Sequence, residues 1–287
     1  GHEALFAGGC VRDACLGRPF KDIDIATSAT PDQVEAIFAG HTVAVGKAFG
    51  VVLVLRDGYT FDVATFRTDG DYADGRHPND VHFGTPEDDA LRRDFTVNGL
   101  FCESVSGVIR DYVDGVPDLK ARVIRAIGDP VARFREDHLR MLRAARFASV
   151  LDFTLDPATQ AAMMAHAAWI KWVSAERIAS EMTRLLCESP RPSVGLRLLR
   201  VTGLLREFLP EVEALYGTEQ PPRYHPEGDV WTHTCLMLDD VPAPRDPVLA
   251  WSLLLHDIGK PVTFCRKDDA EDDGNQIRFP SHAPVGA

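Results

Sequence analysis

The feature that most constrains this chain lies in residues 8–24, where a glycine pair precedes two aspartates separated by one residue. Alternate side chains of a β-strand share a face, so Asp22 and Asp24 are expected to point the same way. Two carboxylates that close repel unless a cation lies between them, and oxygen ligands with room for water and phosphate suit Mg²⁺. The backbone at Gly8 and Gly9 can approach a phosphate closely, with its N–H groups free to point at it. The stretch therefore indicates a triphosphate cradle beside a magnesium site, although a glycine turn and a surface strand with two solvated aspartates match it equally well.

Length and composition indicate a water-soluble protein with more than one domain. The chain has 287 residues, 45% hydrophobic and 26% charged, which is ordinary for globular proteins. No apolar run is long enough to cross a bilayer, and the N-terminus carries no signal-peptide pattern. Six scattered cysteines without a Cys-x-x-Cys pair favour a reducing compartment. A cytoplasmic location is predicted, and a leader lost before Gly1 stays open because the chain lacks an initial Met.

The net charge of −12 does not by itself indicate a nucleic-acid-binding protein. Its distribution is more informative, because residues 120–147 hold eight basic side chains against three acidic ones. A local basic band on an acidic chain can bind phosphates. The alternative is a solvated helical face, which is the commoner role of a charge run.

Hydrophobic periodicity and turn residues predict an α+β fold, with a small mixed head followed by helices from Pro117 onward. In the head, Thr30 begins a capped helix that runs to about Phe38. Asp62 lies on a predicted strand and is either a further carboxylate of the metal site or a solvent-facing residue. The predicted strands of the head, in one mostly antiparallel sheet, span residues 4–7, 23–27, 43–45, 51–55, 60–64 and 107–114.

Two predicted helices carry candidate nucleotide-binding residues. A helix over residues 88–99 would place Asp94 and Asn98 on one face with Arg93 beside them, and these types suit ribose hydroxyls and a triphosphate. A helix over residues 134–151 would make Asp137 and Arg140 neighbours. A carboxylate beside a guanidinium matches the polar edge of cytosine or adenine. By itself, a surface ion pair of little energetic value explains the second pair better.

A third constellation follows a plausible linker near residues 220–223. His256 and Asp257 end an apolar stretch, with His233 upstream and His282 downstream. Imidazoles and a carboxylate suit a divalent transition metal, and a His-Asp pair is unfavourable to bury unpaired. A lone histidine is usually structural, so the prediction depends on the combination.

Taken together, these residues resemble the tRNA nucleotidyltransferase family, comprising the bacterial-type (class II) CCA-adding enzymes and related poly(A) polymerases. The resemblance covers most of the chain, with Gly99 standing where alanine is usual. The loop around residues 67–78 resembles the loop associated with the switch from C to A addition. The motifs that carry the resemblance are Gly8-Gly9…Arg12…Asp22-Ile-Asp24, Arg92-Arg93-Asp94-Phe-Thr-Val-Asn98, Asp111-Tyr-Val-Asp114-Gly, Glu136-Asp137-His-Leu-Arg140 and Ser174-Ala-Glu176-Arg177-Ile-Ala-Ser-Glu181.

The resemblance implies a polymerase β-like nucleotidyltransferase head at residues 1–115, an all-helical neck and body at 116–220, and a partial helical HD module at 225–287. In the HD module His233, His256 and Asp257 would bind a second divalent metal, while the last Asp ligand of that family pattern is absent. In the head Asp22 and Asp24 would be catalytic and hold Mg²⁺. The residues implied to bind nucleotide are Gly8, Gly9, Arg12, Arg93, Asp94, Asn98, Asp137, Arg140, Arg143 and Arg146.

The resemblance further implies Mg²⁺-dependent addition of CCA, from CTP and ATP, to the 3′ end of tRNA without a nucleic-acid template. A-only addition, poly(A) synthesis and, from another class, HD phosphohydrolase activity on cyclic phosphates are the alternatives. The expected partners are the tRNA acceptor end and the two nucleotides, with no membrane. The sequence leaves the oligomeric state undetermined.

Overall fold

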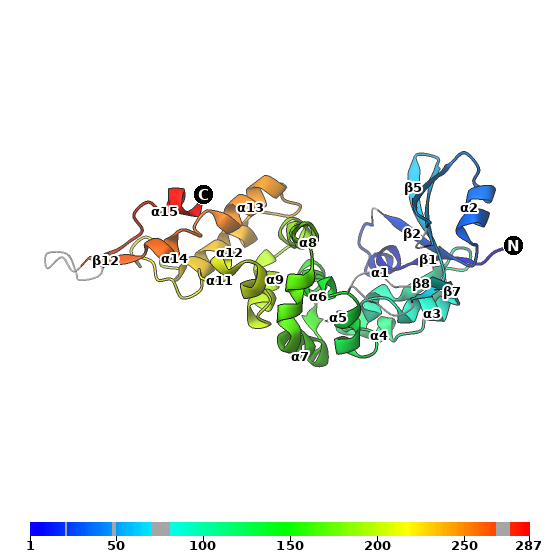
Figure 1. Ribbon diagram of the computed structural model, residues 1–287, viewed down its shortest axis with the longest axis horizontal. Helices are drawn as coiled ribbons and strands as arrows, with labels where there is room; N and C mark the ends of the chain where they lie inside the picture. The colour runs from blue at the N-terminus through cyan, green and yellow to red at the C-terminus, as the bar shows by residue number, and fades with distance from the viewer. Residues whose placement is uncertain (21, 48–49, 70–80, 268–275) are drawn as a thin grey trace. The chain divides into compact units, whose positions relative to one another are not determined.

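The structure is a computed structural model that describes residues 1–20, 22–47, 50–69, 81–267 and 276–287 (Figure 1). The chain forms two compact units, Gly1–Asp137 and His138–Ala287. The predicted loop residues Tyr72, Asp74, Arg76 and Pro78 lie outside the described part of the chain. The division into three parts at residues 115 and 220 stays a prediction.

The first unit is built on a seven-stranded sheet with the strand order β3-β4-β5-β2-β1-β8-β9. β2 and β5 are parallel, whereas the other neighbouring strands of the sheet are antiparallel, so the sheet is mixed, as the predicted α+β head requires. A separate antiparallel pair is formed by β6 (Arg67–Asp69) and β7 (Val81–Phe83). The strands of the main sheet are β1 (Ala4–Ala7), β2 (Ile23–Thr27), β3 (Thr42–Gly46), β4 (Val51–Arg56), β5 (Tyr59–Thr65), β8 (Leu100–Glu103) and β9 (Ile109–Asp111).

One face of this sheet packs against α2 (Pro31–Ile37), which lies beside the strands in Figure 1. Val34 of α2 belongs to a buried cluster with Val52, Val54 and Val63. The helix begins as predicted, because the Thr30 side chain accepts from the N–H of Gln33 in a capping box. Side chains alternate along β2 and β5, so their even-numbered residues, among them Asp24 and Asp62, belong to the opposite face.

The opposite face is covered by different elements. α1 (Gly9–Cys15) contacts β1, β2 and β8, and a second buried cluster joins the sheet to α3 (Pro86–Leu91). Ala90 of α3 packs in that cluster with Phe66 and Phe101, whose rings meet edge to face. This packing brings the end of α3 to the carboxylate-bearing face of the sheet.

The helix predicted over residues 88–99 is wrong as a continuous element. α3 ends at Leu91, the backbone at Phe95 is extended, and a short 3₁₀ helix, η2 (Thr96–Asn98), follows. The reason is tertiary: Phe95 forms a β-bridge with Ala126, and the N–H of Thr96 donates to the Arg125 carbonyl. Strand-like pairing therefore prevails over local helix propensity at this point.

The remaining elements of the first unit lead to Asp137. The predicted helix over residues 134–151 is interrupted there, because Asp137 has extended backbone angles after the preceding helix ends at Glu136. Asp137 and Arg140 are therefore not one turn apart on a single helix, which corrects the geometry expected from their spacing. The elements are α4 (Gly115–Ala121), β10 (Val123–Ile124) and α5 (Pro130–Glu136).

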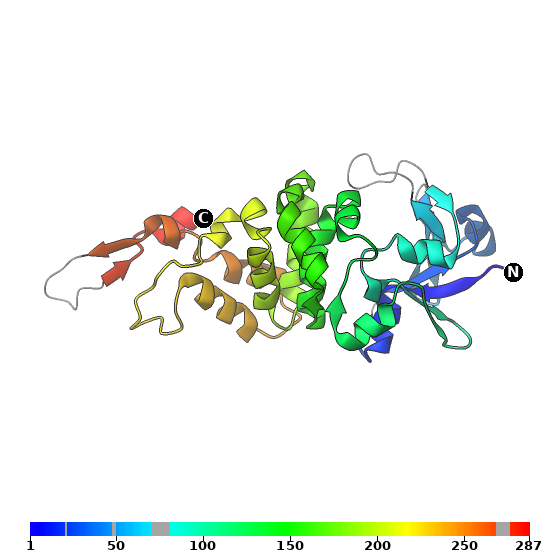
Figure 2. The same ribbon diagram turned by 90° about the horizontal axis from the view of Figure 1, so that it is seen from below.

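The second unit is mainly helical, with α6, α8 and α9 in mutual contact and α12 packed on α9 and α13 (Figures 1 and 2). It is not entirely helical, since it also contains β11 (Thr154–Leu155) and a hairpin of β12 (Cys265–Lys267) and β13 (Gln276–Arg278). Its helices are α6 (Leu139–Leu151), α7 (Pro157–His166), η3 (Ala167–Trp172), α8 (Ala175–Glu188), α9 (Pro192–Val201), α10 (Leu205–Phe208), α11 (Pro210–Glu213), α12 (Val230–Asp240), α13 (Pro247–Leu255), α14 (Lys260–Thr263) and α15 (His282–Gly286). Among the residues that the structure describes, none of the helices has the length and apolar character that spanning a membrane requires.

A buried ion pair joins α6 to α8. Arg146 is 1% exposed, and its Nε donates to Glu181 at 2.5 Å, while Nη1 of Arg143 reaches the other oxygen of Glu181 at 3.4 Å. Burial lowers the pKa of Arg146 to about 10, and the Glu181 carboxylate opposes that shift. Because burial removes both charges from water, each is stabilised mainly by the other. Removing either side chain would therefore leave an unpaired buried charge.

We expect Glu181→Ala to lower the free energy of unfolding by about 3–5 kcal/mol, because it strands a buried guanidinium. Glu188→Ala is the matched control on the same helix: its carboxylate is 41% exposed and pairs with Arg184. That surface pair is worth at most about 0.5 kcal/mol. Urea unfolding followed by circular dichroism measures both, and similar losses in the two variants would contradict the structural role given to the buried pair.

Candidate active site

Three carboxylates lie near one another where the start of β2 adjoins the middle of β5. Asp24 of β2 is directly opposite Asp62 of β5 in the parallel register, and the exposed Asp22 immediately precedes β2. Burial raises the pKa of Asp24, Arg93 opposes the rise, and the charges of Asp62 and Asp22 add to it. The sequence left Asp62 open, and the strand register pairs it with Asp24. Asp24 is half-buried whereas Asp22 and Asp62 are exposed, and carboxylate oxygens with access to water and phosphate suit a divalent cation such as Mg²⁺.

The glycine turn lies against the same cluster. Gly8 has a φ of 70°, and a Cβ placed there would lie 2.7 Å from Nη1 of Arg93 and 3.7 Å from Oδ2 of Asp24. A side chain at this position would therefore displace the arginine. The N–H of Gly8 already donates to the Leu100 carbonyl, contrary to the expectation of a free donor, whereas Gly9 opens α1.

Arg93 is fixed by a carboxylate that sequence reasoning missed. Asp89 is 1% exposed and accepts from Nη2 of Arg93 at 2.9 Å, and it also pairs with Arg92 at 2.6 Å. Burial alone would raise the pKa of Asp89, but the two guanidinium groups outweigh it and lower the pKa. The guanidinium of Arg93 also lies 5.0 Å from the centre of the Phe101 ring. The signal in the sequence was the spacing, three and four residues before the two arginines.

A second polar chain links the first and second motifs. Nη1 of the buried Arg12 donates to Oδ1 of Asn98 at 2.6 Å, and Nδ2 of Asn98 donates to Asp94 at 3.0 Å. Arg12 also pairs with Asp13 at 2.8 Å. Asp94 and Asn98 are thus in contact, as their spacing predicted, although not on the face of one helix, and the contact of Arg12 with Asn98 joins residues far apart in the sequence.

The predicted base-selecting residues fall in different units. Asp137 is half-buried at the end of the first unit, while Arg140, Arg143 and Arg146 are on α6 of the second. Arg140 is 9% exposed, and Arg146 is held inside the helical unit by Glu181. Of this set, Arg146 has the least access to a ligand.

The second candidate metal centre brings together His233, His256 and Asp257. Their candidate ligand atoms lie within 4.8 Å of one another. Nε2 of His256 is 3.1 Å from Oδ2 of Asp257, and Nε2 of His282 is 3.7 Å from Oδ1. Lys260 also contacts Asp257 at 2.7 Å, and although burial alone would raise the pKa of Asp257, His256 and Lys260 outweigh it and lower the pKa to about 2.

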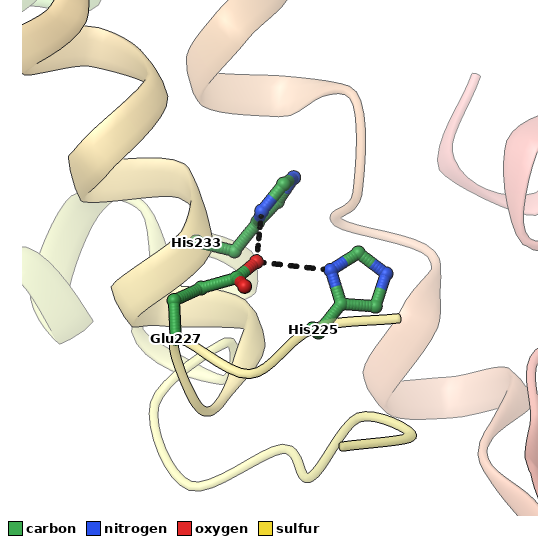
Figure 3. A group of neighbouring side chains, drawn as sticks. All are labelled: His225, Glu227 and His233. Atoms are coloured by element: carbon green, nitrogen blue, oxygen red, sulfur yellow. Dashed lines mark hydrogen bonds and ion pairs between the residues drawn. The ribbon is translucent and has the colours of Figure 1, made fainter. Parts of the chain in front are cut away.

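The hydrogen bonds of His256 require a proton or a metal between this ring and Asp257. Nδ1 of His256 lies 3.0 Å from the Leu253 carbonyl, an oxygen that can only accept, so Nδ1 carries the proton. In neutral His256 the lone pair of Nε2 therefore faces the Asp257 carboxylate, and that contact needs a proton or a metal between the two atoms. The hydrogen bond to Asp257 raises the pKa of His256, so a proton can meet that need, and two imidazoles with a carboxylate are also a ligand set that suits a divalent metal. The sequence missed Glu227, which contacts both His225 and His233 (Figure 3).

Comparison with known proteins agrees with this geometry. Residues 4–125 match the model of the poly A polymerase head domain, and residues 152–216 match that of a probable RNA and SrmB-binding site of polymerase A. The CCA-adding enzyme of Geobacillus thermodenitrificans is 48% identical over 205 residues, covering 71% of this chain and 50% of that enzyme. The chain therefore spans about half the length of this curated relative.

Solved structures show the same likeness. The Bacillus stearothermophilus CCA-adding enzyme in complex with CTP is 36% identical, with a TM-score of 0.74 over 91% of this chain and 60% of that one. A tRNA nucleotidyltransferase complexed with a primer tRNA and an incoming ATP analog is 25% identical, with a TM-score of 0.62 over 83% of this chain and 72% of that one. The carboxylate cluster, the arginine beside its glycine turn and these matches have one explanation: the chain belongs to the family of tRNA nucleotidyltransferases and poly(A) polymerases.

Proposed function

We propose that this protein adds CMP, CMP and AMP, from CTP and ATP, to the 3′ end of tRNA without a nucleic-acid template. The observation that carries the proposal is the carboxylate cluster of Asp22, Asp24 and Asp62 beside Arg93 and the Gly8 turn. The likeness to CCA-adding enzymes, one of them solved with CTP, supports the choice of substrates. We further propose that the protein acts on tRNA in the cytoplasm and that no membrane takes part.

Asp22 and Asp24, with Asp62 as a third carboxylate, would hold Mg²⁺. When bound, the metal would supply positive charge for an in-line displacement at the α-phosphate by the tRNA 3′-hydroxyl. Arg93, anchored by Asp89, presents a guanidinium of fixed orientation to the triphosphate. The bonded chain of Arg12, Asn98 and Asp94 offers a rigid polar surface for the ribose.

Base selection is assigned to Asp137 and Arg140, whose acceptor and donors match the polar edges of cytosine and adenine. Arg143 and Arg146 would support α6 through Glu181, and Arg143 is the more accessible of the two. The basic band of residues 120–147 would guide the acceptor stem through phosphate contacts. In this proposal residues 1–115 catalyse, 116–220 select and bind, and 225–287 form a partial HD module with its own divalent metal.

We expect Asp24→Asn to reduce nucleotide addition by more than about 100-fold. Mutating a residue that only supports a metal ligand already lowers metal affinity or activity by about 10- to 100-fold, and Asp24 would be a ligand itself. The pKa of Asp24 is raised in the folded protein, so its ionised form opposes folding once the pH exceeds that pKa. The metal-free variant should therefore melt at a higher temperature than the parent at neutral pH, and Mg²⁺ should stabilise only the parent. Primer extension and thermal melting with and without Mg²⁺ measure these effects.

Asp57→Asn is the control for this variant. Asp57 is 86% exposed in the turn between β4 and β5, and asparagine tolerates its positive φ. It should keep the activity and the Mg²⁺ response of the parent. Retained activity in Asp24→Asn would overturn the metal assignment.

A product ladder separates the transferase alternatives. Transcripts of tRNA ending in the discriminator base, in C and in CC should all be extended to CCA when CTP and ATP are supplied. Extension of the CC transcript alone, by one A, would identify an A-adding enzyme, and a long A tract would identify a poly(A) polymerase. Hydrolysis of cyclic phosphates without any extension would favour the HD phosphohydrolase alternative.

Asp137→Ala should weaken discrimination against UTP and GTP by about 5- to 150-fold, the equivalent of the 1–3 kcal/mol carried by a bidentate base contact. Triphosphate affinity should change less, because Arg93 and the metal carboxylates would remain. Competition among four nucleotides, scored by sequencing the products, measures the discrimination. Glu188→Ala, the exposed change on α8, is the control, and unchanged selectivity in Asp137→Ala would refute the assignment.

A further inference from the structure

Glu227 lies between the side chains of His225 and His233, near the start of α12 (Figure 3). Its Oε1 is 2.7 Å from Nδ1 of His233 and 3.0 Å from Nδ1 of His225. His233 is on the first turns of α12, whereas His225 and Glu227 are in the segment just before it. The side chains are 22–25% exposed, so all three groups are largely removed from solvent.

These contacts determine which ring nitrogens carry protons. An ionised carboxylate only accepts hydrogen bonds, so Nδ1 must be the donor in both rings. A neutral imidazole has a single N–H, and its other nitrogen is then an acceptor or a metal ligand. Nε2 of His233 and Nε2 of His225 are therefore left with their lone pairs, and Figure 3 shows both pointing away from Glu227.

The same tautomer recurs around Asp257. Nδ1 of His256 lies 3.0 Å from the Leu253 carbonyl, and Nδ1 of His282 lies 3.0 Å from the Phe279 carbonyl. The rings of His233 and His256 are 5.8 Å apart, and each residue offers a ligand atom within 4.8 Å of one on the buried Asp257. Among these histidines, only His225 and His233 owe their tautomer to a side chain rather than to the backbone.

We propose that Glu227 is the positioning residue of the second metal centre, fixing the Nδ1–H tautomer of His233 so that Nε2 is presented to a divalent transition metal with His256 and Asp257. This inference rests on the proposed metal site of the HD module. The chemistry is general, since metal-bound imidazoles usually donate their other N–H to a carboxylate or carbonyl that orients the ring. His225 donates to the same oxygen and so holds Glu227 in place from the other side.

The test is a titration of the full chain with Co²⁺ alone, followed by the visible absorption of the bound ion and by metal content. Glu227→Ala should weaken binding by about 10- to 100-fold with an unchanged number of ions bound. Glu227→Gln keeps an acceptor oxygen and should restore most of the affinity. Glu211→Ala, an exposed change on α11, is the control and should bind like the parent.

A second readout addresses the tautomer directly and needs no metal. Long-range ¹H–¹⁵N NMR of the metal-free chain at about pH 8, where most imidazoles are neutral, should show a protonated Nδ1 in His233 of the parent. In Glu227→Ala the ring should shift toward the Nε2–H tautomer. An unchanged tautomer, or unchanged Co²⁺ affinity beside a parent that binds the ion, would overturn the positioning role.

Two further outcomes are distinct from these. A parent that binds no ion would overturn the second metal site itself, and with it this inference. Loss of one of two bound ions in both Glu227→Ala and His225→Ala would show that the trio holds an ion of its own, which would also overturn the positioning role. Nucleotide addition should stay at the parental level in all of these variants, so failure here does not bear on the proposed transferase activity.

Discussion

The partly buried charge of Asp24, beside Asp62 on the adjoining parallel strand, is the constraint on which the candidate site in the head depends. The two residues are paired in register, and partial burial raises the pKa of Asp24, with the charge of the exposed Asp62 adding to that rise. The fold offsets this with Arg93, whose position in turn depends on the buried Asp89 and on the absence of a side chain at Gly8. The candidate site therefore places the positively charged side chain of Arg93 beside three carboxylates, and an excess of carboxylate oxygens suits a bound Mg²⁺.

Arginines serve two different purposes in this chain. In the head, Arg12 and Arg93 are bonded to neighbouring side chains yet belong to the face that carries the carboxylates. In the helical unit, Arg146 is enclosed with Glu181 and contributes to the joint between α6 and α8. A buried ion pair of this kind is poor evidence of net stabilisation, but removing one partner lowers the free energy of unfolding strongly, because the other charge is left unpaired. The basic band seen in the sequence thus contains both ligand-facing candidates and at least one structural residue.

The two candidate metal centres differ in the ligands they offer. The head provides carboxylate oxygens, which suit a hard ion that keeps water and phosphate in its shell. The second unit provides imidazole nitrogens around Asp257, which suit a transition metal, and it sets their tautomers with Glu227 and with backbone carbonyls. The difference in chemistry means that the two centres need not compete for the same ion.

The sequence by itself determined the family, the α+β class, the capped helix at Thr30 and the strand that carries Asp24, because these depend on local spacing and on short motifs. Only the tertiary structure decided where the helices break at Arg92 and Asp137, since bridging between Phe95 and Ala126 is invisible to local periodicity. It also decided that Asp62 pairs with Asp24, that Asp89 contacts Arg93 and Glu227 contacts His233, and that Arg146 is enclosed. Each of these depends on partners or packing that spacing along the chain does not specify, and burial then decides whether a charged residue supports the fold or faces a ligand.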